Sequence, residues 1–213
     1  MDTIALKDMH FWDKIADKYA KQAISDEAAY QTKLEITQKY MQPHMKVLEF
    51  GCGTGSTAIV HAPHVAHILA TDIADNMLVH GRRKAEDAGI SNIEFQRAGI
   101  EEFEAEPQSF DMILGLNIIH LCADPGAVMK KVRTLLKPAG FFIQSTACIG
   151  EMNPMIKMAL PVMKVFGKAP KTVAKFRSDD LLNMIDEADL RIIETWTPKQ
   201  KGVKFIVAQK GID

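Results

Sequence analysis

The chain has 213 residues, of which 47% are apolar and 25% charged, a composition typical of one globular domain. Its formal net charge of -1 gives no electrostatic support for nucleic-acid binding. No apolar run approaches the roughly 20 residues of a membrane span, and the first residues lack the apolar stretch of a signal peptide. Three widely spaced cysteines match neither a disulfide framework nor a zinc pattern, so we expect a cytoplasmic protein that binds no metal.

The first forty residues are expected to form two helices. Phe11, Ile15 and Tyr19 recur at helical spacing, and a second helix should start after Asp26 and stop before Pro43. Beyond this point short apolar runs alternate with amphipathic helical segments. Strands are expected at 45–50, 65–71, 93–96, 110–116 and 141–147, helices at 56–62, 75–89, 125–136 and 178–187, and a closing hairpin at 191–196 and 203–208.

Strands that alternate with helices predict a parallel sheet covered by helices on both faces. In such a sheet the ligand binds at the carboxyl ends of the strands. The first strand ends there in a glycine-rich turn, with the sequence VLEFGCGTG at positions 47–55. The turn has Gly51, Gly53 and Gly55 at alternate positions. It therefore matches neither the Gly-x-Gly-x-x-Gly of a dinucleotide site nor a P-loop, which needs a lysine.

Two acidic residues indicate which ligand this turn binds. Glu49 precedes the glycines, where it would repel a pyrophosphate but attract an ammonium or a sulfonium group. Asp72 ends the second strand 21 positions after Gly51, about the spacing at which an acid reaches ribose hydroxyls in a nucleotide fold. Together they predict a pocket for S-adenosylmethionine, which combines an adenosyl group with a cationic tail and leaves S-adenosylhomocysteine as product.

The same residues carry a family resemblance. The glycine turn is similar to the first motif of class I S-adenosylmethionine-dependent methyltransferases, small-molecule type, and the stretch ATDIADNML at 70–78 resembles the second. The segment from Phe110 to Phe142 resembles the fourth motif, its helix and the turn before the next strand. The resemblance is good over about residues 40–148 and implies a Rossmann-like three-layer α/β/α fold. It also implies a seven-stranded sheet in the order 3-2-1-4-5-7-6 with strand 7 antiparallel.

That fold implies one methyltransferase domain over residues 1–213. It would consist of an N-terminal helical cover (1–42), a cofactor-binding core (43–148), a lid insertion (149–177), and a C-terminal helix and hairpin (178–213). The resemblance places the adenine beside hydrophobic residues and the methionine end beside the glycine turn. It implies that the cofactor contacts Glu49, Gly51, Cys52, Gly53, Gly55, Asp72, Ile73, Met77, Gly99, Ile100, Gly115, Leu116 and, from the helical cover, Tyr19. Gly99 departs from the family, which often has an acid there.

His120, just beyond the fourth strand, is the candidate catalytic residue. It could accept a proton from the methyl acceptor, or it could only shape the pocket, because methyl transfer from a sulfonium depends mainly on alignment and desolvation. The histidines at 61, 64 and 67 resemble a metal motif, but a turn at Pro63 separates them, so we interpret them as surface or packing residues.

Residues 152–177 have the most unusual composition of any segment in the chain. They contain four methionines, six basic residues and no acidic one. A solvated basic face is one interpretation, and a lid for an apolar or anionic acceptor, with peripheral membrane contact, is the other. The predicted function is methyl transfer to a small-molecule or lipid- or quinone-like acceptor by displacement at the methyl group. The alternative is a non-catalytic S-adenosylmethionine-binding sensor or partner subunit, and the oligomeric state stays open.

Overall fold

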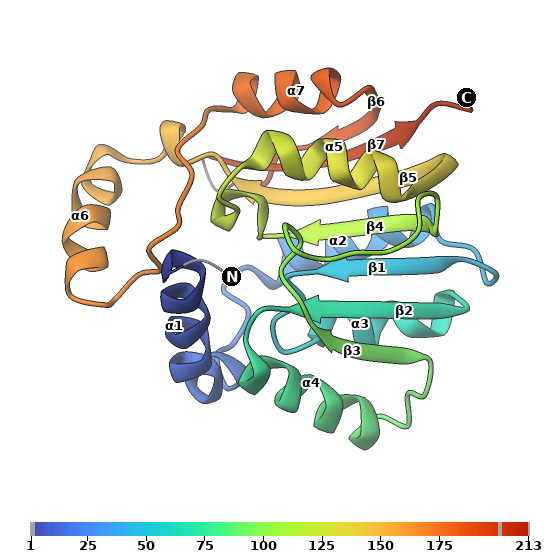
Figure 1. The fold of residues 1–213 in the computed structure, drawn as a ribbon, viewed down its shortest axis with the longest axis horizontal. Coiled ribbons are helices and arrows are strands. Elements are labelled where there is room, and N and C mark those ends of the chain that lie inside the picture. Colours follow the sequence, from blue (N-terminus) through green and yellow to red (C-terminus); the bar gives the residue numbers. More distant parts are fainter. Residues whose placement is uncertain (1–2, 200–201, 213) are drawn as a thin grey trace.

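The computed structural model describes residues 3–199 and 202–212. Its strands form one mixed seven-stranded sheet with the order β3-β2-β1-β4-β5-β7-β6 (Figure 1). Neighbouring strands are parallel except β7, which is antiparallel to both β5 and β6, so the predicted topology is confirmed. The strands are β1 (Lys46–Phe50), β2 (His67–Asp72), β3 (Ile93–Arg97), β4 (Phe110–Leu116), β5 (Leu136–Ala147), β6 (Leu190–Trp196) and β7 (Val203–Lys210).

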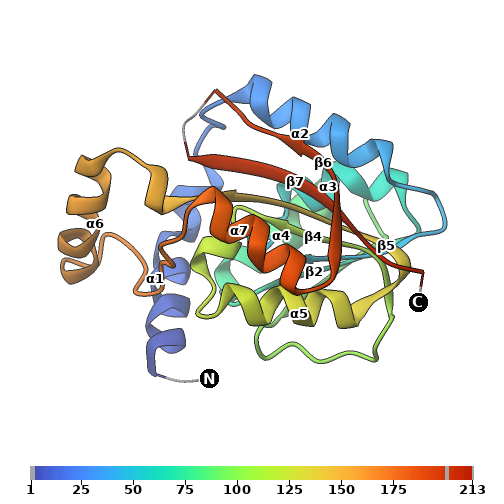
Figure 2. The same ribbon diagram turned by 90° about the horizontal axis from the view of Figure 1, so that it is seen from above.

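Helices cover both faces of the sheet, which makes three layers (Figure 2). One face is covered by α2 (Glu27–Lys39), α3 (Ser56–His61) and α4 (Asp75–Asp87), and the other by α5 (Pro125–Leu135) and α7 (Ser178–Glu187). The remaining helices, α1 (Thr3–Ala20) and α6 (Pro154–Val165), lie beyond the carboxyl ends of the parallel strands. Short 3-10 turns are η1 (Ala62–His64), η2 (Ile119–Leu121) and η3 (Ile149–Glu151).

The helix boundaries follow local signals in the sequence. Asp26 caps α2 by accepting a hydrogen bond from the backbone N–H of Ala29 at 2.9 Å, and Asn153 caps α6 in the same way. Gly89, at a φ of +67°, follows α4 as the expected stop. The largest difference from the expected boundaries is in β5, which begins at Leu136 rather than Phe141, because Leu136 already pairs with Phe110 of β4.

The core consists of two hydrophobic clusters, one on each face of the sheet. The cluster under α5 and α7 contains the fully buried rings of Phe50, Phe110 and Phe142. The cluster under α2, α3 and α4 contains mainly aliphatic side chains such as Val47 and Ile68, together with the buried ring of Phe205. This packing buries the sheet but leaves the carboxyl ends of its parallel strands to be covered by α1 and the segment 149–177.

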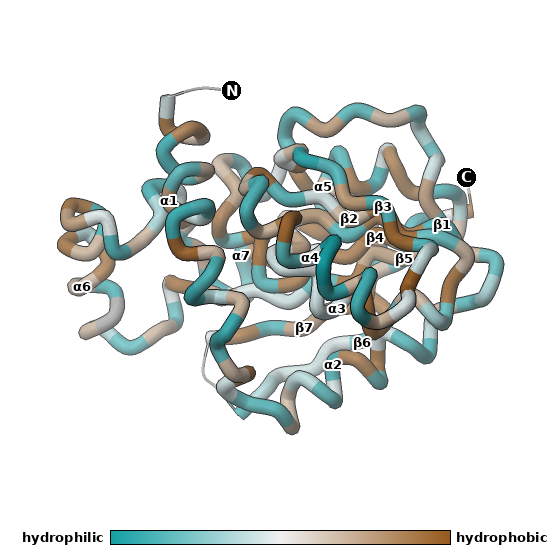
Figure 3. The backbone as a smooth tube through the Cα atoms, turned by 90° about the horizontal axis from the view of Figure 1, so that it is seen from below, coloured by the Kyte–Doolittle hydropathy of each residue, from teal (hydrophilic) through white to brown (hydrophobic). Residues whose placement is uncertain are grey.

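Helix α6 projects from the body of the molecule (Figures 1 and 2). It nevertheless carries hydrophobic residues, drawn brown in Figure 3, and the side chains of Met155, Met158 and Val165 are more than three-quarters exposed. Among the helices of the described residues, none has the length and apolarity needed to cross a bilayer. The exposed apolar side chains of α6 are therefore left without a packing partner among the described residues.

Candidate active site

Two adjoining cavities lie at the carboxyl edge of the sheet. The larger, of about 900 Å³, surrounds the glycine turn, and the smaller, of about 530 Å³, lies toward α2 and β5. Their walls share residues from α1, α2 and β4. The most prominent shared residues are Trp12, Tyr19, Tyr30, Leu116 and Asn117. The arrangement suits two ligands that must meet, because each has its own cavity and a common boundary.

Glu49 is the acid of the larger cavity that a cationic ligand would hold in its ionised form. Its side chain is only 3% exposed, and its Oε2 atom has no hydrogen-bond partner among the described residues. Burial raises its pKa from an ordinary 4.5 to about 8. A buried carboxylate oxygen without a partner is costly, and a cationic ligand in the cavity would satisfy it. The residue therefore fits the positively charged end of S-adenosylmethionine and not a phosphate.

Asp72 lies in the same cavity at the end of β2. Its two carboxylate oxygens accept backbone hydrogen bonds from Gly53 at 2.8 Å and from Ala74 at 3.0 Å. Burial raises its pKa, and these hydrogen bonds oppose that rise. Each oxygen has a second lone pair, so the carboxylate can still accept hydrogen bonds from a pair of ligand hydroxyls. Its fixed orientation suits a ribose.

Hydrophobic side chains form the wall of the cavity beyond Asp72. Ile73, Met77, Gly99 and Ile100 all line it, as expected for residues that flank an adenine ring. Gly99 has room for little more than a hydrogen atom, because a Cβ there would lie 3.1 Å from Ile73. The neighbouring acid, Glu101, also lines the cavity, but its Oε1 accepts a hydrogen bond from the backbone of Ala123.

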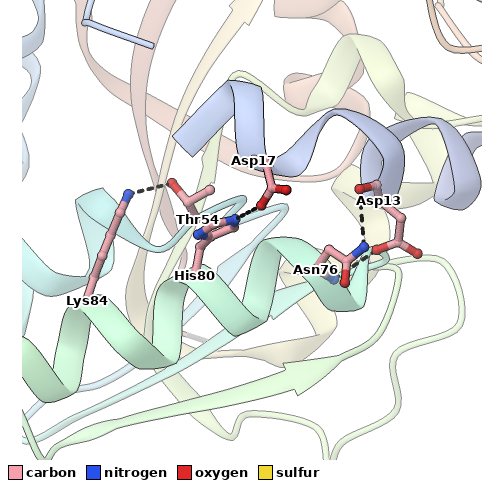
Figure 4. A network of polar contacts seen from close by, with 6 residues as sticks. All are labelled: Asp13, Asp17, Thr54, Asn76, His80 and Lys84. Atoms are coloured by element: carbon pink, nitrogen blue, oxygen red, sulfur yellow. Dashed lines mark hydrogen bonds and ion pairs between the residues drawn. The ribbon is translucent and has the colours of Figure 1, made fainter. Parts of the chain in front are cut away.

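Helix α1 closes the larger cavity. Trp12 and Tyr19 line it, and their rings meet edge to face with centroids 6.4 Å apart. Figure 4 shows how the helix is attached to α4. Asp13 accepts a hydrogen bond from the backbone of Asn76 at 2.9 Å, and Asp17 contacts the His80 ring at 2.8 Å. Burial and the nearby Asp72 raise the pKa of Tyr19, so the tyrosine is a neutral part of the cover.

The glycine turn combines a ligand surface with close packing. Gly53 faces the cavity at a φ of +53°, and the Tyr19 ring is its nearest neighbour. Gly55 is different: it does not line either cavity, and a Cβ there would lie 2.7 Å from the Phe95 ring. Close packing against Phe95 accounts for this glycine, and its expected contact with the cofactor stays a prediction. Cys52 lines the cavity as a buried thiol whose pKa is raised by burial.

Gly115 is a second glycine with a packing role. It does not line either cavity, because its Cα faces the ring of Phe50, and its expected contact with the cofactor stays a prediction. A Cβ at this position would approach that ring to 2.6 Å, so the glycine is explained by packing within the sheet. Leu116, the next residue, faces the opposite side of β4 and lines both cavities.

His120 lies in the wall of the smaller cavity and not in that of the larger one. Its Nδ1 is 3.1 Å from the Thr146 hydroxyl, whereas Nε2 has no partner among the described residues. Burial lowers its pKa to about 4, so the ring is neutral near pH 7. A neutral imidazole with one free nitrogen can accept a hydrogen bond or a proton from a ligand in this cavity.

Other polar residues of the smaller cavity were not predicted. Lys33 donates a hydrogen bond to the Ser145 hydroxyl at 2.9 Å, and Ser145 donates to Asn117 at 3.3 Å. His61, interpreted from the sequence as a surface or packing residue, is completely buried and lines the cavity. The available signal was Asn117, a polar residue directly after an apolar strand. Lys33 and His61 lie on helices, and the spacing of residues in the sequence does not show which side of each helix faces the cavity.

The segment 149–177 contributes to both cavities. Part of this lining comes from residues 168–177, the stretch after α6 that leads back to the sheet and that we call the return stretch. Met152, Leu160 and Val173 line the smaller cavity, and Pro170 lines both. Met158, by contrast, is 77% exposed on α6. Within the described residues no group of three or more histidine, cysteine and carboxylate side chains is arranged to hold a metal. The three cysteines are free and buried.

Comparison with known proteins agrees with this geometry. The methyltransferase domain family matches residues 41–196. A ubiquinone biosynthesis O-methyltransferase of Actinobacillus pleuropneumoniae is 31% identical over 157 residues, which are 70% of this chain and 67% of that protein. A protein of the same name from Acinetobacter baumannii (strain AYE) is 32% identical over 102 residues, or 47% of this chain and 43% of that protein. The chain therefore spans less than half the length of the Acinetobacter relative that it matches.

Solved structures share the fold at low identity. The YcgJ protein from Bacillus subtilis has a TM-score of 0.71 at 18% identity, and the match covers 85% of this chain and 99% of that one. An S-adenosylmethionine-dependent methyltransferase from Mesorhizobium loti has a TM-score of 0.65 at 17% identity, covering 84% and 98%. The [4+2]-cyclase SpnF has a TM-score of 0.73 at 13% identity, and the match covers 90% of this chain and 84% of that one. The fold alone thus accompanies more than one chemistry.

The sheet order and the acidic cavity at its carboxyl edge define a Rossmann-like protein of the class I methyltransferase type. With the family match over most of its length, the chain belongs to the methyltransferase domain family, as its resemblance to class I S-adenosylmethionine-dependent methyltransferases predicted.

Proposed function

We propose that this protein transfers a methyl group from S-adenosylmethionine to a small-molecule, lipid- or quinone-like acceptor. The observation that carries the proposal is the unpaired carboxylate of Glu49, in a cavity that also contains Asp72 and adjoins a second, separate cavity. The names of the ubiquinone biosynthesis relatives support an oxygen on a small molecule as the site of methylation.

S-adenosylmethionine, when bound, supplies a methyl group on a positively charged sulfur. In the larger cavity Glu49 would face its cationic end, Asp72 would accept its ribose hydroxyls, and Ile73, Met77 and Ile100 would surround its adenine. Trp12 and Tyr19 of α1 would exclude water from the reacting atoms. Because displacement depends on alignment and desolvation, this binding accounts for most of the chemistry that the protein must perform.

We propose that His120 accepts the proton that the methyl acceptor loses when it is methylated. An acceptor in the smaller cavity would lie against the free Nε2 of this residue, while Thr146 holds the ring through Nδ1. The low pKa keeps the ring neutral and able to accept a proton near pH 7. Asn117, at the boundary of the two cavities, would orient the acceptor oxygen toward the cofactor.

Calorimetry and a turnover assay together test the function. S-adenosylhomocysteine should bind more tightly than NAD, because Glu49 repels the pyrophosphate of NAD. Tighter binding of NAD would contradict the assignment. With labelled S-adenosylmethionine, a screen of metabolite and lipid extracts should yield a methylated product and S-adenosylhomocysteine. A protein that binds the cofactor but methylates nothing in any extract would instead be the non-catalytic sensor or partner subunit.

We also propose that α6 contacts an anionic membrane surface. Met155, Met158, Val165 and Phe166 are each more than 70% exposed, and basic residues accompany them. Between Met152 and Arg177 the chain has six basic residues and no acidic one. Exposed apolar side chains beside lysines are typical of segments that lie in the headgroup region of a bilayer. Such a contact would bring a lipid-like acceptor close to Met152 and Leu160 in the smaller cavity.

Vesicle co-sedimentation tests this contact. The protein should bind vesicles that contain phosphatidylglycerol more strongly than vesicles of phosphatidylcholine alone, and added salt should weaken binding because it screens exposed charges. The double variant M158S/F166S should lose most of the binding, whereas V79S, an exposed change on α4, should not. Equal sedimentation with both kinds of vesicle, or no loss in M158S/F166S, would exclude the membrane contact.

A further inference from the structure

The floor of the smaller cavity contains polar groups that methyl transfer does not account for. Lys33 is half-buried, and its ammonium group has one hydrogen-bond partner in the described part of the chain, the neutral hydroxyl of Ser145. His61 is completely buried, and neither of its ring nitrogens has a partner there. Both residues line the same cavity. A buried imidazole without partners is costly, so this pair indicates that something polar belongs between them.

The two residues lie on neighbouring helices, α2 and α3, and line the same cavity. Both α2 and α3 run from the carboxyl edge of the sheet toward its amino edge, since each leads toward the start of a parallel strand. Near the carboxyl edge the Tyr30 hydroxyl of α2 is 3.5 Å from the Thr57 hydroxyl of α3. Lys33 lies three residues after Tyr30, and His61 four after Thr57. Each is therefore about one helical turn deeper, on the same face of its helix as the touching pair.

The charges around this floor favour an anion. Burial lowers the pKa of Lys33, and Asp26 opposes that effect. Asp26 is itself exposed and caps α2, and no carboxylate of the described residues lies within ion-pair distance of Lys33. His61 has its pKa lowered to about 4 by burial, then by His64, so it is a neutral ring that can donate one hydrogen bond. His120, also neutral, lies in the same wall.

Building on the proposed function, we infer that the methyl acceptor carries an anionic oxygen group that binds between Lys33 and His61, below the methylated position. A carboxylate or an ionised phenol would accept one hydrogen bond from the ammonium and one from the imidazole. The rest of the cavity wall includes Leu34, Leu116 and Val203, so the body of the acceptor is apolar. Ser145 and Asn117 connect this anion site to the boundary with the larger cavity.

Three probe molecules of similar shape test the inference by calorimetry, with and without saturating S-adenosylhomocysteine. They are 4-hydroxybenzoate, 4-hydroxybenzamide, which replaces the carboxylate by a neutral amide, and 4-nitrophenol, which is mostly a phenolate at about pH 8, where all three are titrated. We expect the benzoate to bind at least about tenfold more tightly than the amide, because one charge-assisted hydrogen bond contributes an affinity difference of this size. Tight nitrophenol binding with weak benzoate binding would assign the site to a phenolate instead of a carboxylate.

Variants of α2 separate this site from general effects on the fold. Lys33→Met should abolish the preference for the anion, Lys33→Arg should keep most of it, and Lys39→Met, an exposed lysine on the same helix, should change nothing. Affinity for S-adenosylhomocysteine should be equal in all of them. The inference is overturned if none of the probes binds, if amide and anions bind equally, or if Lys33→Met keeps the preference. Failure of S-adenosylhomocysteine to bind would overturn the proposed function instead, and the probes would still report on the anion site.

Discussion

At the scale of single residues, the site depends on side chains that are buried at a cost to stability. Glu49 has an unpaired carboxylate oxygen, and His61 has two unpaired ring nitrogens, in a fold whose other buried polar atoms are mostly paired. Protein interiors rarely tolerate such groups without a function or a ligand. The same residues therefore have two measurable consequences: the ligand-free protein should be more stable when these unpaired polar groups are removed, and ligands should bind less well without them.

Glu49 should make stability depend on pH. Its pKa is about 8 in the folded protein against an ordinary 4.5, so between these values the folded state binds more protons than the unfolded state. The contribution of Glu49 to the free energy of unfolding should then be greatest below about pH 4.5 and fall as pH rises toward 8, by up to about 1.4 kcal/mol per pH unit, whereas His61 and His120, whose pKa values are lowered to about 4, act in the opposite sense below about pH 6.5. Thermal unfolding of the ligand-free protein across this range measures the effect.

The matched comparison uses Glu49→Gln and Glu35→Gln. The first removes the titrating group and should flatten the decline, while the second changes an exposed acid of α2 and should leave the decline as in the wild type. If the wild type and Glu49→Gln decline in parallel, the carboxyl group does not titrate as its burial indicates.

Asp72 should be needed for cofactor affinity. Replacing it by asparagine removes one of the two carboxylate oxygens and the negative charge, and should weaken S-adenosylhomocysteine binding by about 1.5–3 kcal/mol. Asp75→Asn is the control, because Asp75 pairs with Arg97 on the surface at 3.1 Å and does not line the cavity. Calorimetry that finds equal loss in the two variants would place the ribose elsewhere.

His120 should affect turnover and not cofactor binding. Its alanine variant should lose about a hundredfold or more in kcat, the usual contribution of a general base. Affinity for S-adenosylhomocysteine should stay unchanged, since His120 lines only the smaller cavity. His64→Ala, at an exposed position, serves as the control. A loss of only a few-fold in kcat would mean that the ring shapes the pocket and takes no proton.

At the scale of elements, α1 and the return stretch of the segment 149–177 form one cover. The buried carboxylate of Asp8 on α1 accepts hydrogen bonds from the backbone N–H groups of Lys171 and Thr172. Ala174 donates a further backbone hydrogen bond to the carbonyl of His120 at 2.8 Å. Residues far apart in the sequence thus hold each other above the two cavities. We propose that this cover opens and closes as a unit for ligand exchange.

Asp8→Ala tests that coupling. The change leaves two backbone N–H groups without their acceptor, which costs about 1–3 kcal/mol and corresponds to roughly tenfold or more faster hydrogen exchange. The faster exchange should appear at residues 168–174 and in α1. Asp13→Ala, which breaks the contact of α1 with α4, should loosen α1 alone. Exchange in 168–174 that is unchanged in Asp8→Ala would show that the return stretch is held by other contacts.

At the scale of the whole molecule, polar groups gather where the parallel strands end. Glu49, Asp72 and Asn117 come from three different strand ends and meet at one edge, because parallel strands place all their carboxyl ends together. At the amino ends of the parallel strands, loops connect the helices to the strands. Ligand binding at this edge costs the core little, since both hydrophobic clusters lie between the sheet and its covering helices.

The sequence alone predicted the alternating strands and helices, the glycine turn and the two acids of the larger cavity, and its resemblance to class I methyltransferases implied the sheet order. These features depend on local patterns: strand and helix periodicity, the spacing from Gly51 to Asp72, and the order of elements along the chain. They are readable because each is encoded within a short stretch of residues. The positions of Glu49 and Asp72 in one cavity agree with that interpretation.

Only the tertiary structure decided the smaller cavity and the uses of individual glycines. Lys33 and His61 belong to different helices, and whether they face the same space depends on how α2 and α3 pack on the sheet. Gly55 and Gly115 resemble ligand-contact positions in the sequence, but the rings of Phe95 and Phe50 fill the space beside them. Side-chain packing between distant elements determines both results, and no pattern along the chain encodes it directly.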